Sequence, residues 1–407
     1  MKFIKLLVVL IVAAAVVAAL WFYRPWSQYS PANFASLTKP EMLTYNFTHM
    51  AELVPARQLL KSQSPREFPV AGQADLLSVT YEYEGQQKSL ADFIAESSTL
   101  GLLVIKGGQI EYEQYFQDTN EQSLYTSWSM AKSFVATVVA KAVAAGLIDS
   151  WDDPAEKYAP QYAGSDFGKT SIKALMDMST GIDFDEDYAN QSSDINEFFF
   201  GTYIKQKDPD SLLLKFLRNR PEYTDFEYIS PNSQVLSAVL RGVYKEPLVG
   251  IMQREIWEPL GMGNDANWLQ HKEGEEGQAL GYCCLNATLR DYARFGLYHM
   301  EAQRGTGLGA QELPSDWVSR LTQPASVAHK PGGEAYSGRG YSSHFWLPRN
   351  GNGMFFAAGV YGQFIWMDPQ RDVMVVRTSS DPEWTRRYPE SEATNKAILD
   401  YFAGQSE

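Results

Sequence analysis

The chain has 407 residues, of which 44% are apolar, and its formal net charge is −14. This length and apolar content suffice for a large hydrophobic core divided into two lobes or two domains. The acidic balance, with no basic stretch to offset it, argues against nucleic acid as a partner.

The amino-terminal segment predicts membrane targeting. An uninterrupted apolar run extends from Leu6 to Tyr23, and Lys2 and Lys5 precede it. Its length is close to the roughly 20 residues that a membrane-spanning helix needs. Bulky aromatic residues at its end favour an uncleaved anchor over a cleaved signal peptide, for which Val17 and Ala19 would be the small residues before the cut. We therefore expect a protein of the cell envelope, anchored in the inner membrane with its bulk in the periplasm or outside, or secreted if the segment is cleaved.

Composition along the chain divides it into three parts. We expect residues 1–25 to be the anchor or signal segment, and residues 26–75 a linker and an N-terminal extension that packs on the rest. Residues 76–407 form the main domain. Within the extension, the one helix we expect lies near Met50–Leu60.

Cysteine and histidine usage predicts neither a disulfide framework nor a metal centre. Cys283 and Cys284 are adjacent, cannot link distant parts of the chain, and are interpreted as small buried apolar residues. The five histidines are scattered without ligand spacing, so we expect no metal and no cofactor.

A hairpin and then a long helix open the main domain. Leu102–Ile105 is typical of a buried strand, Gly107 and Gly108 of a tight turn, and Gln109–Glu113 of a strand with one exposed face. The helix that follows carries Ser129 at its start and continues through almost wholly apolar residues to Ala145.

Ser129 and Lys132 at the start of this helix form the most informative pair in the chain. A serine hydroxyl is a weak nucleophile without a base, and a lysine three residues on lies over the same helix face. The N–H groups and dipole at the helix start can stabilise charge that develops near the serine. The same spacing occurs at Ser36 and Lys39, where Pro40 disfavours a helix. On spacing alone, a helix start with a serine and a solvated lysine remains an equal alternative.

The middle of the domain, about residues 150–300, reads as a helical lobe, and strands return near the C-terminus. The expected helices are Thr170–Met178, Asp210–Arg218, Asn232–Tyr244, Leu289–Met300 and a final one at Glu392–Phe402. The expected strands are Phe345–Leu347, Met354–Ala358, Gln363–Asp368 and Val373–Thr378. Strands at both ends and helices between them predict one antiparallel sheet built from both termini, flanked by helices, with an inserted all-α lobe.

Two more motifs carry groups suited to catalysis. Tyr228 precedes the helix at Asn232 and can act as a general base if a neighbouring ammonium lowers its pKa. Ser230 lies between them, and a helix cap is the alternative interpretation of Ser230 and Asn232. At the strand end Ala357–Val360, small residues allow close approach of a substrate, and a free N–H can help bind an oxyanion. A simple hairpin turn is the alternative there.

The order and placement of these three motifs resemble the serine β-lactamase and penicillin-binding-protein superfamily. The chain is most similar to class C type β-lactamases, their esterase relatives and 6-aminohexanoate-dimer hydrolase-like proteins. The resemblance implies an α/β, β-lactamase-like fold and an acyl-enzyme mechanism. Ser129 would be the nucleophile, Lys132 its activating partner, and Tyr228 the base and later the proton donor. The N–H groups of Ser129 and Val360 would hold the oxyanion.

The resemblance also implies substrate contacts and marks two departures. Glu186-Asp187-Tyr188 is similar to a run in the 6-aminohexanoate-dimer hydrolase branch, which makes Tyr188 a candidate substrate contact. An aromatic anchor for an acidic loop is the alternative. Gly359 and Ser230 would contact substrate through their motifs. Ser230 replaces the usual asparagine, and Ala357 replaces a lysine that helps β-lactamases hold the β-lactam carboxylate.

We therefore expect a serine hydrolase that acts on a small-molecule amide or ester. A catalytically inactive cell-envelope binding protein of the same fold is the alternative that the two departures support. A D,D-peptidase or a weak β-lactamase is a further alternative within the enzymes.

Overall fold

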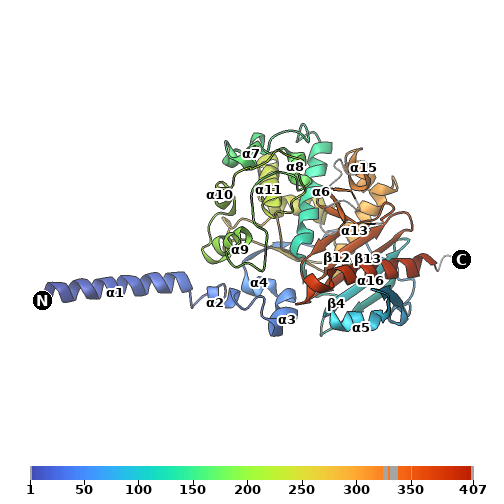
Figure 1. Ribbon diagram of the computed structural model, residues 1–407, viewed down its shortest axis with the longest axis horizontal. Coiled ribbons are helices and arrows are strands. Elements are labelled where there is room, and N and C mark those ends of the chain that lie inside the picture. The colour runs from blue at the N-terminus through green and yellow to red at the C-terminus, as the bar shows by residue number, and fades with distance from the viewer. Residues whose placement is uncertain (1, 324–328, 331–337, 350, 405–407) are drawn as a thin grey trace.

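The computed structural model describes residues 2–323, 329–330, 338–349 and 351–404. Its body combines a seven-stranded antiparallel sheet with a lobe of short helices, and α1 (Lys2–Tyr23) projects away from both (Figure 1). The strand order is β5-β4-β13-β12-β11-β10-β9, so the N-terminal hairpin pairs with the C-terminal strands. The expected α/β fold, with one antiparallel sheet built from both ends of the domain, is confirmed.

The elements have the following bounds. The main sheet contains β4 (Thr99–Lys106), β5 (Gln109–Tyr115), β9 (Gly340–Ser342), β10 (Phe345–Leu347), β11 (Phe355–Gly359), β12 (Gln363–Asp368) and β13 (Val373–Ser379). The smaller sheets contain β1 (Ala56–Leu59), β6 (Tyr125–Thr126), β7 (Ala266–Leu269) and β8 (Leu285–Ala287), and the pair β2 (Thr80–Tyr83) and β3 (Gln86–Ser89). The longer helices are α6 (Ala131–Ala144), α11 (Pro231–Tyr244), α13 (Leu289–Gln303) and α16 (Trp384–Gly404). Shorter helices are α2 (Pro31–Phe34), α3 (Leu43–Thr48), α4 (Met50–Leu53), α5 (Leu90–Glu96), α7 (Asp166–Lys169), α8 (Ile172–Met176), α9 (Asp194–Phe199), α10 (Pro209–Leu213), α12 (Leu248–Met252), α14 (Gly309–Glu312) and α15 (Trp317–Thr322).

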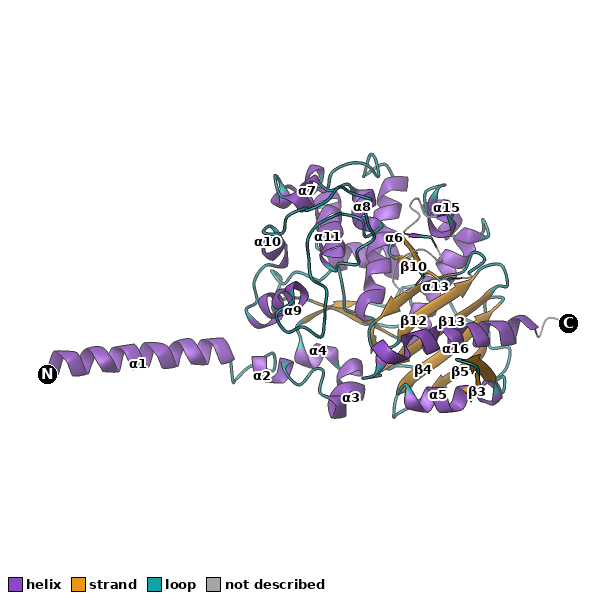
Figure 2. Ribbon diagram, viewed as in Figure 1, coloured by secondary structure: helices purple, strands orange, loops and turns teal. Residues whose placement is uncertain are grey.

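Both faces of the main sheet are buried. Along β4, Leu103 and Ile105 belong to the core shared with α6 and α13, whereas Leu102 and Val104 belong to the core under α5 and α16. Figure 2 shows α5 and α16 lying across one face of the sheet. Burial on both faces explains why β4 is a continuous apolar run rather than an alternating one.

The N-terminal extension packs on the body, and the helix predicted within it is largely wrong. The helix α4 ends at Leu53, and the chain then forms β1, which pairs antiparallel with β7. Pro55 lacks an N–H donor and stands between the two elements, so the helix stops there. Leu43 and Phe47 of α3 are buried in the main core, which fixes the extension on the body.

Other predictions differ from the structure in extent. The helix expected at Asp210–Arg218 is α10, which ends at Leu213, and the final helix begins at Trp384 instead of Glu392. Cys283 and Cys284 are buried as expected, but the structure joins them in a disulfide, which corrects their interpretation as simple apolar residues.

Candidate active site

Ser129 lies in a 3-10 turn, Trp128–Met130, that leads directly into α6. Trp128 has a φ of 44°, an uncommon value for a residue with a side chain, so the turn before the serine is held in a strained conformation. Lys132 follows one turn later and is 2% exposed. Its Nζ lies 2.8 Å from Ser129 Oγ and 2.8 Å from the carbonyl oxygen of Tyr282. The solvated-lysine alternative is therefore wrong.

The environment of Lys132 favours its neutral form. Burial lowers the pKa of Lys132 to about 7, and the charge of Glu186 partly opposes that change. A neutral amine keeps a lone pair that can accept the proton of Ser129, while one of its N–H groups donates to the Tyr282 carbonyl. This position and this lowered pKa are those that a general base for Ser129 requires.

Tyr228 lies in the loop before α11 and faces the same lysine. The Nζ of Lys132 is 5.1 Å from the centre of the Tyr228 ring, and this ring stacks on Trp346 at 5.6 Å. Asn232 is fully buried, and its side-chain amide donates to Met178 Sδ. Ser230 stands at the N-cap of α11, yet its side chain forms no capping hydrogen bond.

Glu186 is the acceptor for Ser230 and a residue whose part in the site the sequence did not reveal. Its carboxylate accepts hydrogen bonds from the backbone N–H of Ser230 at 2.9 Å, from the Ser230 hydroxyl, and from the Tyr188 hydroxyl at 2.7 Å. Burial raises the pKa of Glu186, and the charge of Lys132 and the Ser230 hydroxyl lower it in part. The sequence placed Glu186 only as a neighbour of Tyr188, because its approach to Lys132 depends on the fold.

The end of β11 lies against the segment that carries Ser129. An added Cβ at Gly359 would be 2.3 Å from the Ser127 carbonyl oxygen, so only glycine allows this approach. Gly359 pairs with Gln363 across the hairpin, and Val360 follows directly. The Gln363 side chain donates to the carbonyls of Ser379 at 2.6 Å and Val360 at 3.4 Å, which ties down the turn.

One cavity collects most of the predicted site residues. Its volume is about 1160 Å³, and Ser129, Tyr188, Tyr228, Gly359 and Val360 all line it. Lys132 and Ser230 lie beneath this lining, buried at 2% and 1% exposure. Among the residues that the structure describes, no cluster of His, Cys, Asp or Glu has the arrangement of a metal site.

Comparison with known proteins identifies the family. The Beta-lactamase family model matches residues 89–398. The chain belongs to the β-lactamase family. A separate comparison with curated proteins matches a 6-aminohexanoate-dimer hydrolase from Paenarthrobacter ureafaciens, 25% identical over 350 residues, which cover 84% of this chain and 86% of the relative.

Solved structures agree with a β-lactamase fold. A protein from Bacillus anthracis, named provisionally as a 6-aminohexanoate-dimer hydrolase, superposes with a TM-score of 0.78 at 24% identity, covering 91% of this chain and 97% of its own. EstCE1, described as a hydrolase with promiscuous acyltransferase activity, gives a TM-score of 0.59 at 17% identity over 76% of this chain and 96% of its own. The expected resemblance to the serine β-lactamase and penicillin-binding-protein superfamily is confirmed.

Ala357 stands where the resemblance to β-lactamases leads one to expect a lysine. Ala357 is fully buried in β11 and paired with Ile365 of β12. The cavity is lined by two cationic residues among those described, Lys215 and Arg339, and Arg339 forms an ion pair with Glu392.

Proposed function

We propose that this member of the β-lactamase family is a serine hydrolase that cleaves a small amide or ester through an acyl-enzyme on Ser129. The observation that carries the proposal is the 2.8 Å contact between Ser129 Oγ and Lys132 Nζ. Because burial brings the pKa of Lys132 to about 7, a large fraction of this lysine is a neutral base at physiological pH. A serine next to a buried base at the edge of a cavity is the arrangement that acyl transfer requires.

The mechanism follows from the positions of these groups. Lys132 takes the proton of Ser129 as Oγ attacks the substrate carbonyl and forms a tetrahedral oxyanion, which the N–H groups of Ser129 and Val360 stabilise. The family resemblance implies Tyr228 as the base, but we assign that role to Lys132 because Lys132 is the group in contact with Ser129. Tyr228, whose ring faces Lys132, relays a proton to the leaving amine or alcohol as the bond to it breaks. Water then attacks the acyl-enzyme with the same groups acting in reverse, releasing a carboxylic acid and the free serine.

The cavity and the relatives support a small amide or ester as the substrate. Ala357 supplies no cation at the position where β-lactamases bind the β-lactam carboxylate, which disfavours β-lactam turnover. The names of the relatives are those of hydrolases, one of a 6-aminohexanoate dimer and one with acyltransferase activity. Tyr188, Tyr228, Phe226 and Trp346 give the cavity an aromatic wall suited to an acyl or aminoacyl chain.

An activity-based probe tests the nucleophile. We expect a fluorophosphonate to label the wild type and not Ser129→Ala. Ser36→Ala, at the other Ser-x-x-Lys match of the chain, serves as the matched control and should label like the wild type. Equal labelling of wild type and Ser129→Ala would refute the assignment, and an unlabelled wild type that still binds cell-wall fragments would support the non-catalytic alternative.

A substrate pair distinguishes the remaining enzyme classes. We expect a short-chain nitrophenyl ester to be hydrolysed at least a hundredfold faster, as kcat/KM, than a chromogenic cephalosporin. The reverse order would identify a β-lactamase, and release of D-alanine from a peptide ending in D-Ala-D-Ala would identify a D,D-peptidase.

We also propose that α1 anchors the enzyme in the inner membrane with the catalytic body in the periplasm or outside. The support is a 21-residue helix, Phe3–Tyr23, with a mean hydropathy of 3.0 and no part buried against the body. Release of the chain from membranes by salt alone would contradict an anchor.

A further inference from the structure

The carbonyl of Tyr282 is the second hydrogen-bond partner of Lys132, and the chain is held by contacts on both sides of Tyr282. A neutral amine has two N–H groups and one lone pair, and the direction of its donated hydrogen bond decides where the lone pair points. With an N–H of Lys132 directed at Tyr282 O, the lone pair is free to face Ser129 Oγ, also at 2.8 Å. The position of this carbonyl therefore bears on the orientation of the base.

On the N-terminal side of Tyr282, the chain is fixed to α11. The N–H of Gly281 donates to Gln234 Oε1 at 3.0 Å. An added Cβ at Gly281 would be 2.5 Å from the Ser233 carbonyl oxygen, so the backbone lies as close to the helix as a residue can. Both contacts prevent Gly281, and with it the Tyr282 peptide, from moving along or away from α11.

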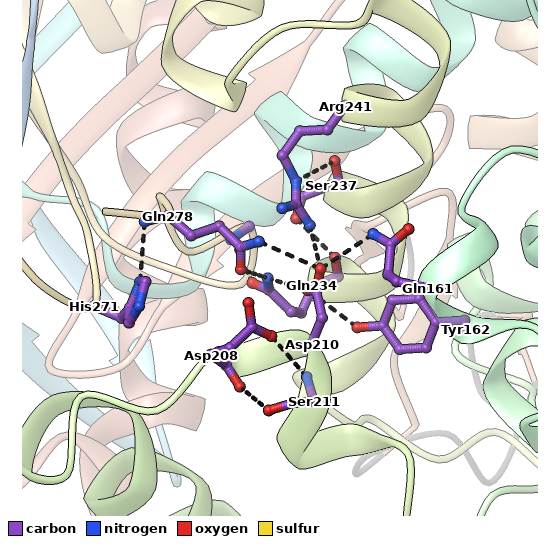
Figure 3. A network of polar contacts seen from close by, with 11 residues as sticks. Gln161, Tyr162, Asp208, Asp210, Ser211, Gln234, Ser237, Arg241, His271 and Gln278 are labelled. Carbon is purple, nitrogen blue, oxygen red and sulfur yellow. Dashed lines mark hydrogen bonds and ion pairs between the residues drawn. The ribbon is translucent and has the colours of Figure 1, made fainter. Parts of the chain in front are cut away.

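The amide of Gln234 is itself oriented by a buried carboxylate. Gln234 Nε2 donates to Asp210 Oδ1 at 2.8 Å, and Asp210 also pairs with Arg241 at 2.6 Å (Figure 3). An ionised carboxylate only accepts hydrogen bonds, so it requires the NH₂ side of the Gln234 amide and directs Oε1 to Gly281. Asp210 is buried and also accepts from the hydroxyl of Tyr162 at 3.2 Å.

On the C-terminal side of Tyr282, the chain is closed by the Cys283–Cys284 disulfide. A bond between adjacent side chains forms a small ring that restricts the backbone torsions of both residues. The carbonyl of Cys283 accepts from Trp268 Nε1 at 2.9 Å, and that of Cys284 accepts from the N–H of Leu269 at 3.1 Å. Both cysteines are buried in the core, which leaves the disulfide a structural rather than a surface feature.

We infer that Gln234 and the Cys283–Cys284 disulfide are positioning elements of the reaction, which hold the Tyr282 carbonyl where it orients Lys132 toward Ser129. This inference rests on the proposed serine-hydrolase function. The inference gives a role to a disulfide that joins no distant segments. It also gives a role to the buried hydrogen bonds of Gln234 and Asp210, which do not line the cavity. Gln234 and the two cysteines do not line the cavity, so their effect on the reaction would pass through Tyr282 and Lys132.

The test uses the full-length chain and two independent variants, Gln234→Met and the double variant Cys283→Ser/Cys284→Ser. Each should lower kcat for a nitrophenyl ester at least tenfold and slow fluorophosphonate labelling to the same degree, with KM within twofold of wild type, since misorientation of the base affects chemistry and not binding. Tyr162→Phe removes a different hydrogen bond to Asp210 and leaves Gln234 in place, so its kcat should equal that of the wild type.

The following results would contradict the inference or the proposed function. A folded Gln234→Met variant with wild-type kcat overturns the role of Gln234. If the double cysteine variant does not fold, the Gln234→Met result alone decides whether the fixed position of the Tyr282 carbonyl matters for the reaction. Two thiols that react with iodoacetamide in denatured, unreduced protein overturn the disulfide. A rise in KM without a fall in kcat overturns the positioning role. A wild-type chain without labelling or turnover refutes the proposed function itself.

Discussion

Lys132 is buried beneath the cavity, Glu186 lines the cavity, and the charge of each changes the pKa of the other. Burial lowers the pKa of Lys132 and raises that of Glu186, while the charge of each partner acts in the opposite direction. Burial therefore favours the neutral amine of Lys132, and the charge of Glu186 opposes this effect. In the proposed mechanism, the same charge would stabilise the ammonium that forms when Lys132 accepts the serine proton.

The pH dependence of ester hydrolysis should report the lysine. The reactive form of Lys132 is the neutral amine, which predominates above its pKa of about 7. Therefore kcat/KM should rise about tenfold per pH unit on the acid side and level off above that pKa. Steady-state rates on an uncharged nitrophenyl ester measure this, and a profile that stays flat across the neutral range would contradict a lysine base.

Removing the charge of Glu186 should move this profile. In Glu186→Gln the amide oxygen can still accept hydrogen bonds from the hydroxyls of Ser230 and Tyr188, whereas the NH₂ group cannot accept from the backbone N–H of Ser230. The negative charge that raises the pKa of Lys132 is gone. We expect the acid limb to shift to lower pH, and kcat to fall about tenfold because the ammonium formed during acylation loses its counter-charge. Asp152→Asn, at an exposed carboxylate that does not line the cavity, is the control and should leave both quantities near wild type.

The close approach of Gly359 to Ser127 predicts a severe effect of one methyl group. In Gly359→Ala the new Cβ would meet a backbone oxygen at 2.3 Å, so the strand end or the Ser129 turn must move. We expect a loss of about 1–3 kcal/mol of stability and at least a tenfold loss of kcat as Val360 N–H leaves the oxyanion position. Thermal melting and ester kinetics measure the two effects.

Gly72→Ala provides the comparison for that variant. An added Cβ at Gly72 has no atom within 4 Å, so stability and kcat should stay at wild-type values. A Gly359→Ala variant that behaves like Gly72→Ala would show that the end of β11 does not take part in the reaction.

The sequence predicts those parts of the site that have a local pattern. Ser129 and Lys132 stand at the start of a long apolar helix, and Gly359 and Val360 at the end of a strand, so the local pattern made both motifs candidates. The family resemblance then implied their roles. Glu186 has no such pattern, since only the fold brings it to Lys132. The strand at Ala56–Leu59 was mistaken for helix because its pairing with β7 is a tertiary contact.

The cysteines illustrate the same limit. Adjacency showed that Cys283 and Cys284 cannot link distant segments, and composition suggested burial, which the structure has. Their mutual bond and their place beside Tyr282 depend on backbone torsions and on the contact with Lys132. Residue spacing predicts neither the disulfide nor the position of the cysteines beside Tyr282.

The separateness of α1 predicts that the anchor and the catalytic body can be uncoupled. No residue of the helix Phe3–Tyr23 is buried against the body, and its apolar side chains are exposed along its length. A chain that begins at Arg24 retains the hydrogen bond from this arginine to the Ile204 carbonyl and should fold with an unchanged melting temperature. We expect the full chain to remain in the membrane pellet after alkaline carbonate extraction, and the shortened chain to be soluble with the kcat/KM of the full chain on a nitrophenyl ester. A shortened chain that loses activity or stability would show that α1 contributes to the catalytic body, and a full chain found in the soluble fraction would contradict the anchor.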